Sequence, residues 1–189
     1  MESKKNISLT AVNVNQDRAL RKAVKALYLQ AFPKEERIPW WLLRLNSRRK
    51  GIDLTAYLHE GALCGFTSSV STDGLQLLLF FAVEQDCRGQ GYGSAILRRI
   101  KSENRVVALN IEPLDPKADN YGQRTRRFAF YQKNGFLDTH YHVWEVGGMF
   151  RVLSTERELD IQTYKKAFRK LTFGLWNVKL EKVQKKEYL

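Results

Sequence analysis

The chain has 189 residues, of which 43% are hydrophobic, and 32 Lys and Arg against 20 Asp and Glu give it a net charge of +12. These numbers suit one compact domain with a sizeable core and exclude a disordered chain. No apolar run approaches the roughly 18 residues that a membrane span needs, and no apolar signal core follows the first residues, so we expect a cytoplasmic protein. The basic balance favours an anionic partner, which could be nucleic acid, the ribosome, a membrane surface or a phosphorylated coenzyme.

Hydrophobic spacing and turn residues predict that helices and strands alternate along the chain, with hairpins in places. In the first helix, Leu20, Val24 and Leu27 recur at helical spacing, after Asn15 or Asp17 as the N-cap. The predicted strands cover residues 7–14, 53–59, 62–70, 74–83, 105–111, 136–145 and 149–154. The first predicted helix ends before Pro33, and the other predicted helices cover residues 39–48, 91–103, 120–134 and 158–173. This order predicts a mixed α/β (α+β) fold around a largely antiparallel sheet.

A glycine-rich turn between an apolar strand and an amphipathic helix is the most specific feature of the sequence. Gly89, Gly91 and Gly93 follow Arg88 at this point, and glycine lets a backbone turn tightly and approach a ligand closely. The N–H groups at the start of the next helix then point at one place, which suits a pyrophosphate. The spacing is neither that of a dinucleotide-binding fingerprint nor that of a nucleotide P-loop. The alternative is an ordinary glycine-rich connection.

Two motifs in this order resemble the GNAT superfamily of N-acetyltransferases. Arg88, Gly91 and Gly93 match the coenzyme motif Gln/Arg-x-x-Gly-x-Gly/Ala, and residues 130–136, Phe-Tyr-Gln-Lys-Asn-Gly-Phe, resemble the element Tyr-x-x-x-Gly-Phe. The resemblance covers roughly residues 7–155, and residues 31–39, Ala-Phe-Pro-Lys-Glu-Glu-Arg-Ile-Pro, also resemble a small bacterial branch of the superfamily. It implies the GNAT fold, with a sheet of six to seven strands flanked by helices, over residues 1–155. Residues 156–189 then form a basic C-terminal extension, helical or loose beyond Gly174.

The resemblance also implies which residues bind acetyl-CoA, the expected co-substrate, with no metal. The strand end at Phe81, Ala82 and Val83 would splay from its neighbour and pair with the pantetheine arm. The family often has Asn seven positions before the Tyr, where this chain has Arg124; Asn120 could substitute, or Arg124 could meet a coenzyme phosphate. The residues expected to hold the pyrophosphate are Arg88, Gly89, Gln90, Gly91, Tyr92, Gly93 and Ser94.

The chemistry expected from the resemblance is direct transfer of an acetyl group to a primary amine, without an acyl-enzyme. Tyr131 is the candidate acid for the leaving thiolate, and a backbone amide of Ala82 or Val83 is the candidate oxyanion donor. Histone-type members have a glutamate base where this chain has Leu77. Glu112, at the end of a predicted strand, is the candidate base or amine-binding group, although a loop anion paired with arginine and a water chain are alternatives.

The acceptor site is predicted less sharply. Glu36, Trp40 and His142 are candidate acceptor-binding residues, while tryptophans such as Trp40 more often serve in core or lid packing. The acceptor could be a small molecule or a protein amine, and the protein a monomer or a homodimer. Cys64 and Cys87 are expected to be free thiols. Alternative functions are a non-catalytic acyl-CoA sensor or partner-binding module on the same fold, and a basic RNA- or ribosome-associated protein.

Overall fold

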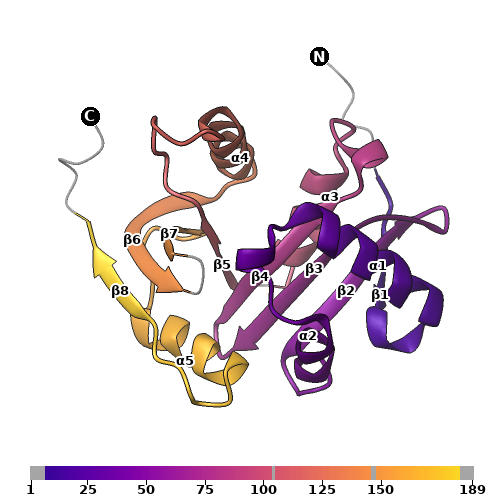
Figure 1. Cartoon of the computed structure of the whole chain (residues 1–189), viewed down its shortest axis with the longest axis horizontal. Coiled ribbons are helices and arrows are strands. Elements are labelled where there is room, and N and C mark those ends of the chain that lie inside the picture. Colours follow the sequence, from indigo (N-terminus) through magenta and orange to yellow (C-terminus); the bar gives the residue numbers. More distant parts are fainter. Residues whose placement is uncertain (1–6, 104, 146–147, 184–189) are drawn as a thin grey trace. The chain divides into compact units, whose positions relative to one another are not determined.

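The computed structural model describes residues 7–103, 105–145 and 148–183. Within these ranges the chain forms two compact units, described separately below. The first unit contains residues up to 69 together with 79–103, and the second contains residues 70–78 together with those after 103. The strands form one mostly antiparallel eight-stranded sheet in the order β1-β2-β3-β4-β5-β7-β6-β8 (Figure 1).

The elements follow the predicted order closely. The helices are α1 (Arg18–Ala31), α2 (Trp40–Asn46), α3 (Tyr92–Lys101), α4 (Tyr121–Lys133) and α5 (Ile161–Leu171). Short 3-10 turns are η1 (Val14–Gln16), η2 (Lys34–Glu36) and η3 (Gln85–Cys87). The strands are β1 (Thr10–Asn13), β2 (Ile52–His59), β3 (Ala62–Thr72), β4 (Leu75–Val83), β5 (Val106–Ile111), β6 (Leu137–Glu145), β7 (Gly148–Ser154) and β8 (Lys179–Lys182).

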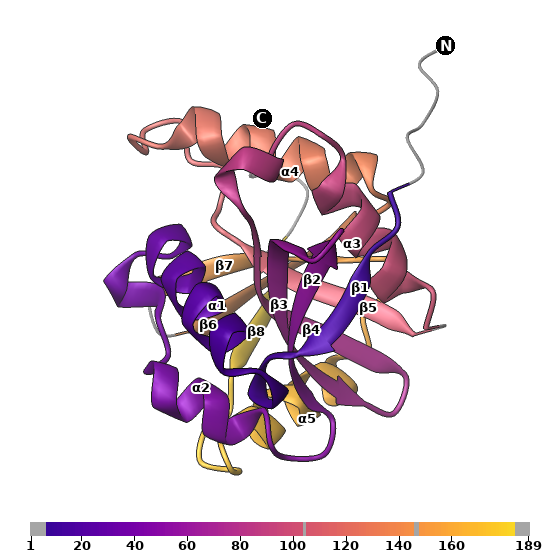
Figure 2. The same ribbon diagram turned by 90° about the vertical axis from the view of Figure 1, so that its right-hand side faces the viewer.

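In the first unit, α1 and α2 lie on one side of β1–β4 and α3 lies on the other side (Figure 2). The helix α1 begins where the sequence predicts, because the Asp17 carboxylate accepts a 2.8 Å hydrogen bond from the N–H of Leu20. Its apolar face places Val24, Leu27 and Tyr28 in a buried cluster with residues of β2, β3 and β4. The Tyr28 hydroxyl donates to the carbonyl of Ile38 at 2.9 Å, which ties the helix to the segment before α2.

In the second unit, β5 is the central strand. Leu75–Leu78 of β4 pair with Val106–Leu109 in parallel register, and β7 pairs with β5 on its other side in antiparallel register. The helix α5 begins at its N-cap Asp160, whose carboxylate accepts from the N–H groups of Gln162 and Thr163. Lys170 Nζ of α5 donates to the carbonyl of Ser71, near the end of β3, at 2.8 Å.

The C-terminal segment differs from the prediction. Residues beyond Gly174 were expected to be helical or loose, but Lys179–Lys182 form β8, which pairs antiparallel with β6. This strand raises the count to eight, against the six to seven expected. It escapes pattern reading because Leu180 is its only apolar residue, and the edge position with two lysines is typical of a protected sheet edge. Residues 184–189 of the predicted extension lie outside the described residues, and the domain division at 155 stays a prediction.

Two smaller differences concern the ends of elements. The first strand covers Thr10–Asn13 only, because Val14–Gln16 turn into η1 behind Asn13, whose side chain accepts from the N–H of Asn15. Asp17, and not Asn15, is the N-cap of α1.

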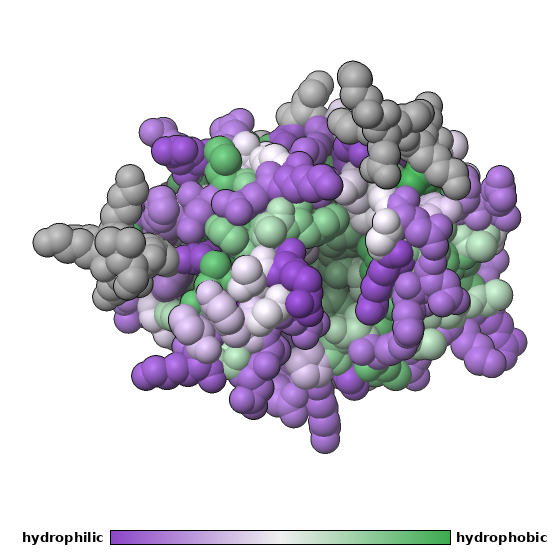
Figure 3. All heavy atoms as spheres, turned by 90° about the horizontal axis from the view of Figure 1, so that it is seen from above, coloured by the Kyte–Doolittle hydropathy of each residue, from purple (hydrophilic) through white to green (hydrophobic). Residues whose placement is uncertain are grey.

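Hydrophilic side chains cover much of the face that Figure 3 shows, which agrees with the excess of Lys and Arg in the sequence.

Candidate functional site

The end of β4 and the turn that follows it lie in the first unit. Phe80 and Ala82 belong to the buried core beneath α1, whereas Phe81 and Val83 are half-buried. The carbonyl of Val83 accepts a 3.1 Å hydrogen bond from Arg88 Nε, so this side chain folds back onto the strand end. The structure therefore brings together the strand end and the glycine turn.

Backbone geometry in the turn depends on glycine at two positions. Gly89 has φ +73° and Gly91 has φ +89°, which is the left-handed region that side chains with a Cβ rarely adopt. Gly91 is the N-cap of α3 and supplies no side chain to cap the helix. Among the described residues, no acceptor within the chain is found for the backbone N–H groups of Tyr92, Gly93 and Ser94. The helix therefore begins with unpaired donors at its positive end, where an anion is stabilised.

The sequence reasoning missed Gly65, a residue of β3 beside the strand end. A Cβ built on Gly65 would lie 2.5 Å from the Ala82 carbonyl oxygen, 3.1 Å from the Ile96 side chain and 3.3 Å from the Val83 Cα. Both β4 and α3 thus approach this position more closely than any other residue type allows. A glycine inside an apolar strand was the available signal for such an approach.

Two free cysteines lie in the same unit. Cys64 on β3 is buried and Cys87 ends the turn η3. Burial first, and then the neighbouring Cys87 thiol, raise the pKa of the Cys64 thiol to about 11. Both cysteines are free in this structure, and Cys64 is protonated at neutral pH.

The second unit holds a cluster of charged side chains around Glu112, directly after β5. One carboxylate oxygen accepts from Asn120 Nδ2 at 2.9 Å and lies 3.3 Å from Arg124 Nε, and the other accepts from Arg127 Nη1. Arg124 also donates to Asn120 Oδ1 at 2.6 Å and to the Pro113 carbonyl at 2.9 Å. Glu112, Asn120 and Arg124 are thus together, as partners of one another.

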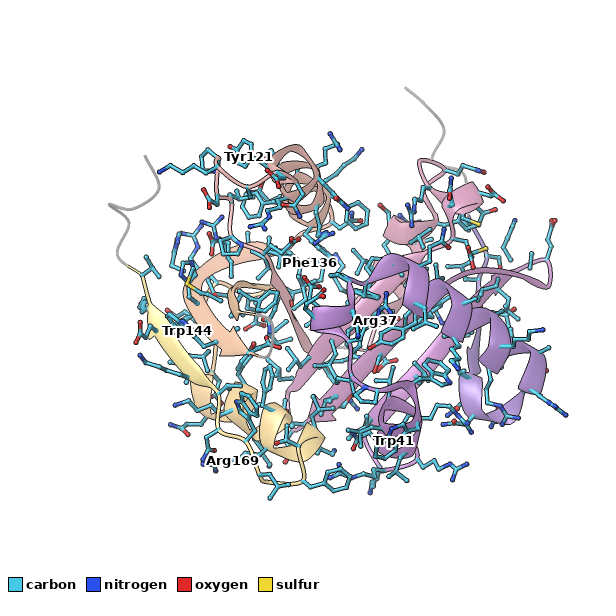
Figure 4. The ribbon with its side chains drawn as sticks, in the orientation of Figure 1. Arg37, Trp41, Tyr121, Phe136, Trp144 and Arg169 are labelled. Carbon is cyan, nitrogen blue, oxygen red and sulfur yellow. The ribbon has the colours of Figure 1, made fainter. Side chains whose placement is uncertain are left out.

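The helix α4 arranges this cluster. Asn120, Arg124, Arg127 and Tyr131 are spaced by four, three and four positions, which places them on one face of the helix. Arg127 was missed by the sequence reasoning, although this spacing could have found it. Tyr121 marks the start of the same helix in Figure 4, with its side chain at the surface.

Tyr131 is buried at the end of this face, between Phe130 and Phe136. The two ring centroids lie 5.4 Å and 5.6 Å from that of Tyr131, both edge-on. Burial raises the pKa of the Tyr131 phenol to about 12, although the charge of Arg127 lowers it in part. The hydroxyl is therefore protonated throughout the neutral range.

The candidate acceptor residues lie in different places. Glu36 ends the turn η2, and Trp40 begins α2 with its ring centroid 5.9 Å from that of Tyr28, so its packing role is observed. The neighbouring Trp41 is 66% exposed on the outer side of α2 (Figure 4). His142 lies on β6, in register with Arg151 of β7 and Glu181 of β8. Their part in binding an acceptor stays a prediction, as does the splay between the strands.

A buried polar chain in the second unit was not predicted. Tyr164 of α5 donates to Asn110 Oδ1 of β5 at 2.8 Å, and Asn110 Nδ2 donates to a carboxylate oxygen of Glu145 on β6. Burial raises the pKa of Tyr164 well above its ordinary value.

Within the described ranges, no group of three or more His, Cys, Asp or Glu could hold a metal ion. No described helix is both long and apolar enough to cross a bilayer.

Comparison with known proteins agrees with the glycine turn and the strand order. Residues 50–137 match the family model described as an acetyltransferase (GNAT) domain. This stretch contains β4, the glycine turn, α3, Glu112 and Tyr131. This part of the chain is therefore similar to GNAT acetyltransferase domains.

Similar proteins extend this result to the fold. Over 76 residues the chain is 32% identical to YjbC of Bacillus subtilis (strain 168), whose name assigns it provisionally to the acetyltransferases. That match covers 40% of this chain and 36% of the relative, so it spans about a third of the relative's length. A structure from Bacteroides thetaiotaomicron, provisionally assigned to the GNAT family, aligns with TM-score 0.65 at 20% identity over 90% of this chain and 100% of the other.

Two further solved structures share the GNAT fold at lower identity. An aminoglycoside 6'-N-acetyltransferase complexed with coenzyme A aligns with TM-score 0.63 and 15% identity, covering 82% of this chain and all of the other. The ribosomal-protein-S18-alanine N-acetyltransferase from Escherichia coli aligns with TM-score 0.56 and 15% identity, covering 78% and 92%. These likenesses show that the GNAT domain has the expected architecture.

Proposed function

We propose that this protein transfers the acetyl group of acetyl-CoA directly to a primary amine of a small molecule or a protein. The observation that carries the proposal is the start of α3, where the N–H groups of Tyr92, Gly93 and Ser94 have no acceptor among the described residues. A pyrophosphate supplies the oxygens that such donors need, and the GNAT domain supplies the reason to expect one here. When bound, acetyl-CoA supplies the activated acetyl group as a thioester.

The first unit would bind and orient the coenzyme. The left-handed backbone at Gly89 and Gly91 keeps the turn open to an approaching phosphate, and Arg88 Nε holds the turn against the carbonyl of Val83. The exposed guanidinium of Arg88 retains donors for a phosphate oxygen. The strand end from Phe81 to Val83 would pair with the pantetheine arm, and an amide of Ala82 or Val83 would stabilise the developing oxyanion.

The second unit would supply the proton for the leaving thiolate, from Tyr131. A pKa of about 12 keeps this phenol protonated at any pH at which an amine acceptor reacts. Replacing Tyr131 by Phe should lower kcat at least tenfold, because only the hydroxyl is lost, while the affinity for acetyl-CoA changes little. Unchanged turnover in Tyr131→Phe across the pH range would exclude Tyr131 as the acid.

The base that deprotonates the acceptor amine has two candidates. Leu77 stands where histone-type members have a glutamate, and it is fully buried in β4. The Glu112 carboxylate already accepts hydrogen bonds from Asn120 and Arg127, so both of its oxygens are engaged within the cluster before any amine arrives. We therefore keep two candidates, Glu112 and a water chain, and expect the acceptor amine to be deprotonated most easily above its own pKa.

Calorimetry with acetyl-CoA, followed by thiol release against a panel of amines, tests the proposal. The panel should include aminoglycosides and N-terminal peptides, because one similar structure is an aminoglycoside 6'-N-acetyltransferase and another is Naa50 of Arabidopsis thaliana in complex with the bisubstrate analogue CoA-Ac-MVNAL. Binding with thiol release that depends on an amine supports the enzyme. Binding of acetyl-CoA without thiol release from any amine supports the acyl-CoA sensor. The presence of Leu77 where histone-type members have a glutamate base argues for that alternative. No binding of acetyl-CoA at all overturns both the enzyme and the sensor.

We further propose a cytoplasmic location, which the two free thiols favour.

A further inference from the structure

A groove between α1 and α2 in the first unit has a composition that the acetyl-transfer reaction does not use. Its volume is about 440 Å³. Five of its six lining residues are cations and none is a carboxylate. The lining residues are Arg18, Arg21, Lys22, Lys25, Trp40 and Arg44.

Helical spacing produces this concentration of charge. Arg18, Arg21, Lys22 and Lys25 follow one another at three-, one- and three-residue steps, so they share one face of α1. Arg18 with Lys22 and Arg21 with Lys25 are like-charge pairs four residues apart, an arrangement that destabilises a helix. A bound polyanion would relieve this repulsion, whereas free solvent only screens it.

The cations of the groove are largely unpaired. Within residues 7–103, the side chains of Arg18, Lys22 and Lys25 form no ion pair, and Arg21 donates to a backbone carbonyl, that of Asn15. Arg44 has a buried Nε for which the described part of the chain offers no hydrogen-bond acceptor. A buried guanidinium nitrogen without an acceptor costs free energy, so this group also lacks a ligand oxygen.

The indole of Trp40 gives the groove an aromatic wall. It packs against the core near Tyr28 on one side, at 5.9 Å between ring centroids, and is half-buried, so part of the ring faces the groove. Guanidinium groups and an aromatic ring beside a row of cations suit a ligand that has both phosphates and planar bases. An acidic peptide offers the charge but no base to stack, and a membrane surface offers no planar group.

We propose that this groove is a binding site for single-stranded RNA, with phosphates on the α1 cations and on Arg44 and a base on Trp40. The site lies on the α1–α2 side of the first unit, whereas the turn that is proposed to hold acetyl-CoA starts α3 on the other side (Figure 2). RNA binding therefore does not require the coenzyme turn, and the α1 cations and the coenzyme turn can be tested separately; Trp40 alone is a candidate for both functions.

The test is fluorescence anisotropy of a labelled ten-nucleotide single-stranded RNA against the whole chain at several salt concentrations. With several phosphates engaged, the logarithm of the affinity should fall with the logarithm of salt by roughly 0.7 for each phosphate contact. Lys22→Glu with Lys25→Glu should weaken binding at least tenfold and reduce the slope by about 1.4. Arg98→Glu with Lys117→Glu carries the same change of net charge on exposed cations elsewhere and should weaken binding less than threefold.

Two further arms identify the ligand. Trp40→Leu should weaken RNA binding about tenfold and leave polyphosphate binding unchanged, and Trp40→Tyr should restore most of the RNA affinity. Thermal melting checks that the Trp40 variants fold, and the lysine variants keep the test valid if they do not. Equal losses of RNA affinity in the two double variants would overturn the proposal that RNA binds in this groove. Polyphosphate or polyglutamate that binds as tightly as RNA would overturn the assignment to RNA.

Discussion

The two regions that carry the candidate active-site residues are prepared for ligands in opposite ways. In the first unit, the start of α3 has N–H donors with no acceptor among the described residues, held by two glycines in left-handed conformation. In the second unit, the charged groups of Glu112, Asn120, Arg124 and Arg127 are already partners of one another. The first region is thus built to accept oxygens from outside, and the second is built to hold a helix and a loop in place.

The largest expected effect comes from a substitution in the first of these regions, the start of α3 with its N–H donors. Gly91→Glu adds a carboxylate and a Cβ where φ is +89°, so it should weaken acetyl-CoA binding at least 100-fold, about 2.7 kcal/mol. The matched control is Gly74→Glu, because Gly74 has a similar φ of +86° with open space around it but lies before β4 in the second unit. Calorimetry should show near-normal affinity for the control. Intact affinity in Gly91→Glu would refute the pyrophosphate assignment.

The pH dependence of stability tests the buried phenol of the second region. The pKa of Tyr131 is about 12 in the folded state and near 10 in the unfolded chain, so the folded protein keeps this proton up to a higher pH than the unfolded chain does. Its contribution is fully present below pH 10 and is lost as pH rises through 12, to a total of about 2 to 3 kcal/mol. Urea unfolding between pH 9 and 12 should show that the free energy of unfolding falls less steeply with pH in Tyr131→Phe than in the wild type. Tyr121→Phe, at the exposed start of α4, should follow the wild type.

Removing the centre of the paired region separates a structural role from a catalytic one. Glu112→Ala leaves Asn120, Arg124 and Arg127 without their shared acceptor and should lower the free energy of unfolding by about 2 kcal/mol. Exposed Glu158 is the control, and Glu158→Gln should change stability by less than about 0.5 kcal/mol. Chemical denaturation measures both. If Glu112→Gln keeps stability but abolishes turnover, Glu112 is the base.

Two alanine substitutions sharpen the comparison further, and the second of them has the smallest expected effect. Gly65→Ala forces a Cβ to 2.5 Å from the Ala82 carbonyl oxygen, so it should destabilise the protein by about 1 to 3 kcal/mol and weaken acetyl-CoA binding. Gly122→Ala, inside α4, meets only the flexible end of Arg126 at 3.6 Å and should stabilise the protein by about 0.5 to 1 kcal/mol. Thermal melting compares them. Equal melting temperatures would mean that β3 and β4 have room to separate.

Local patterns predicted most of the fold. Asp17 and Pro33 bound α1, the Asp73-Gly74 turn opens β4, and Gly135 follows α4, because caps, turns and apolar spacing act over a few residues. The strand β8 was beyond such reasoning, since its pairing with β6 depends on a partner some forty positions earlier. Its side chains also contact that partner, with Lys179 Nζ 5.2 Å from the Trp144 ring centroid.

The sequence by itself determined that a glycine-rich turn follows an apolar strand and opens a helix, because glycine is the residue that permits left-handed backbone there. It also determined the helical face that ends in Tyr131. Only the tertiary structure decided that Arg127 and Arg124 converge on Glu112, that Gly65 gives Ala82 its space, and that α1 and α2 enclose a basic groove. Those facts depend on which side chains meet after folding, and burial and distance between remote residues are not encoded in local spacing.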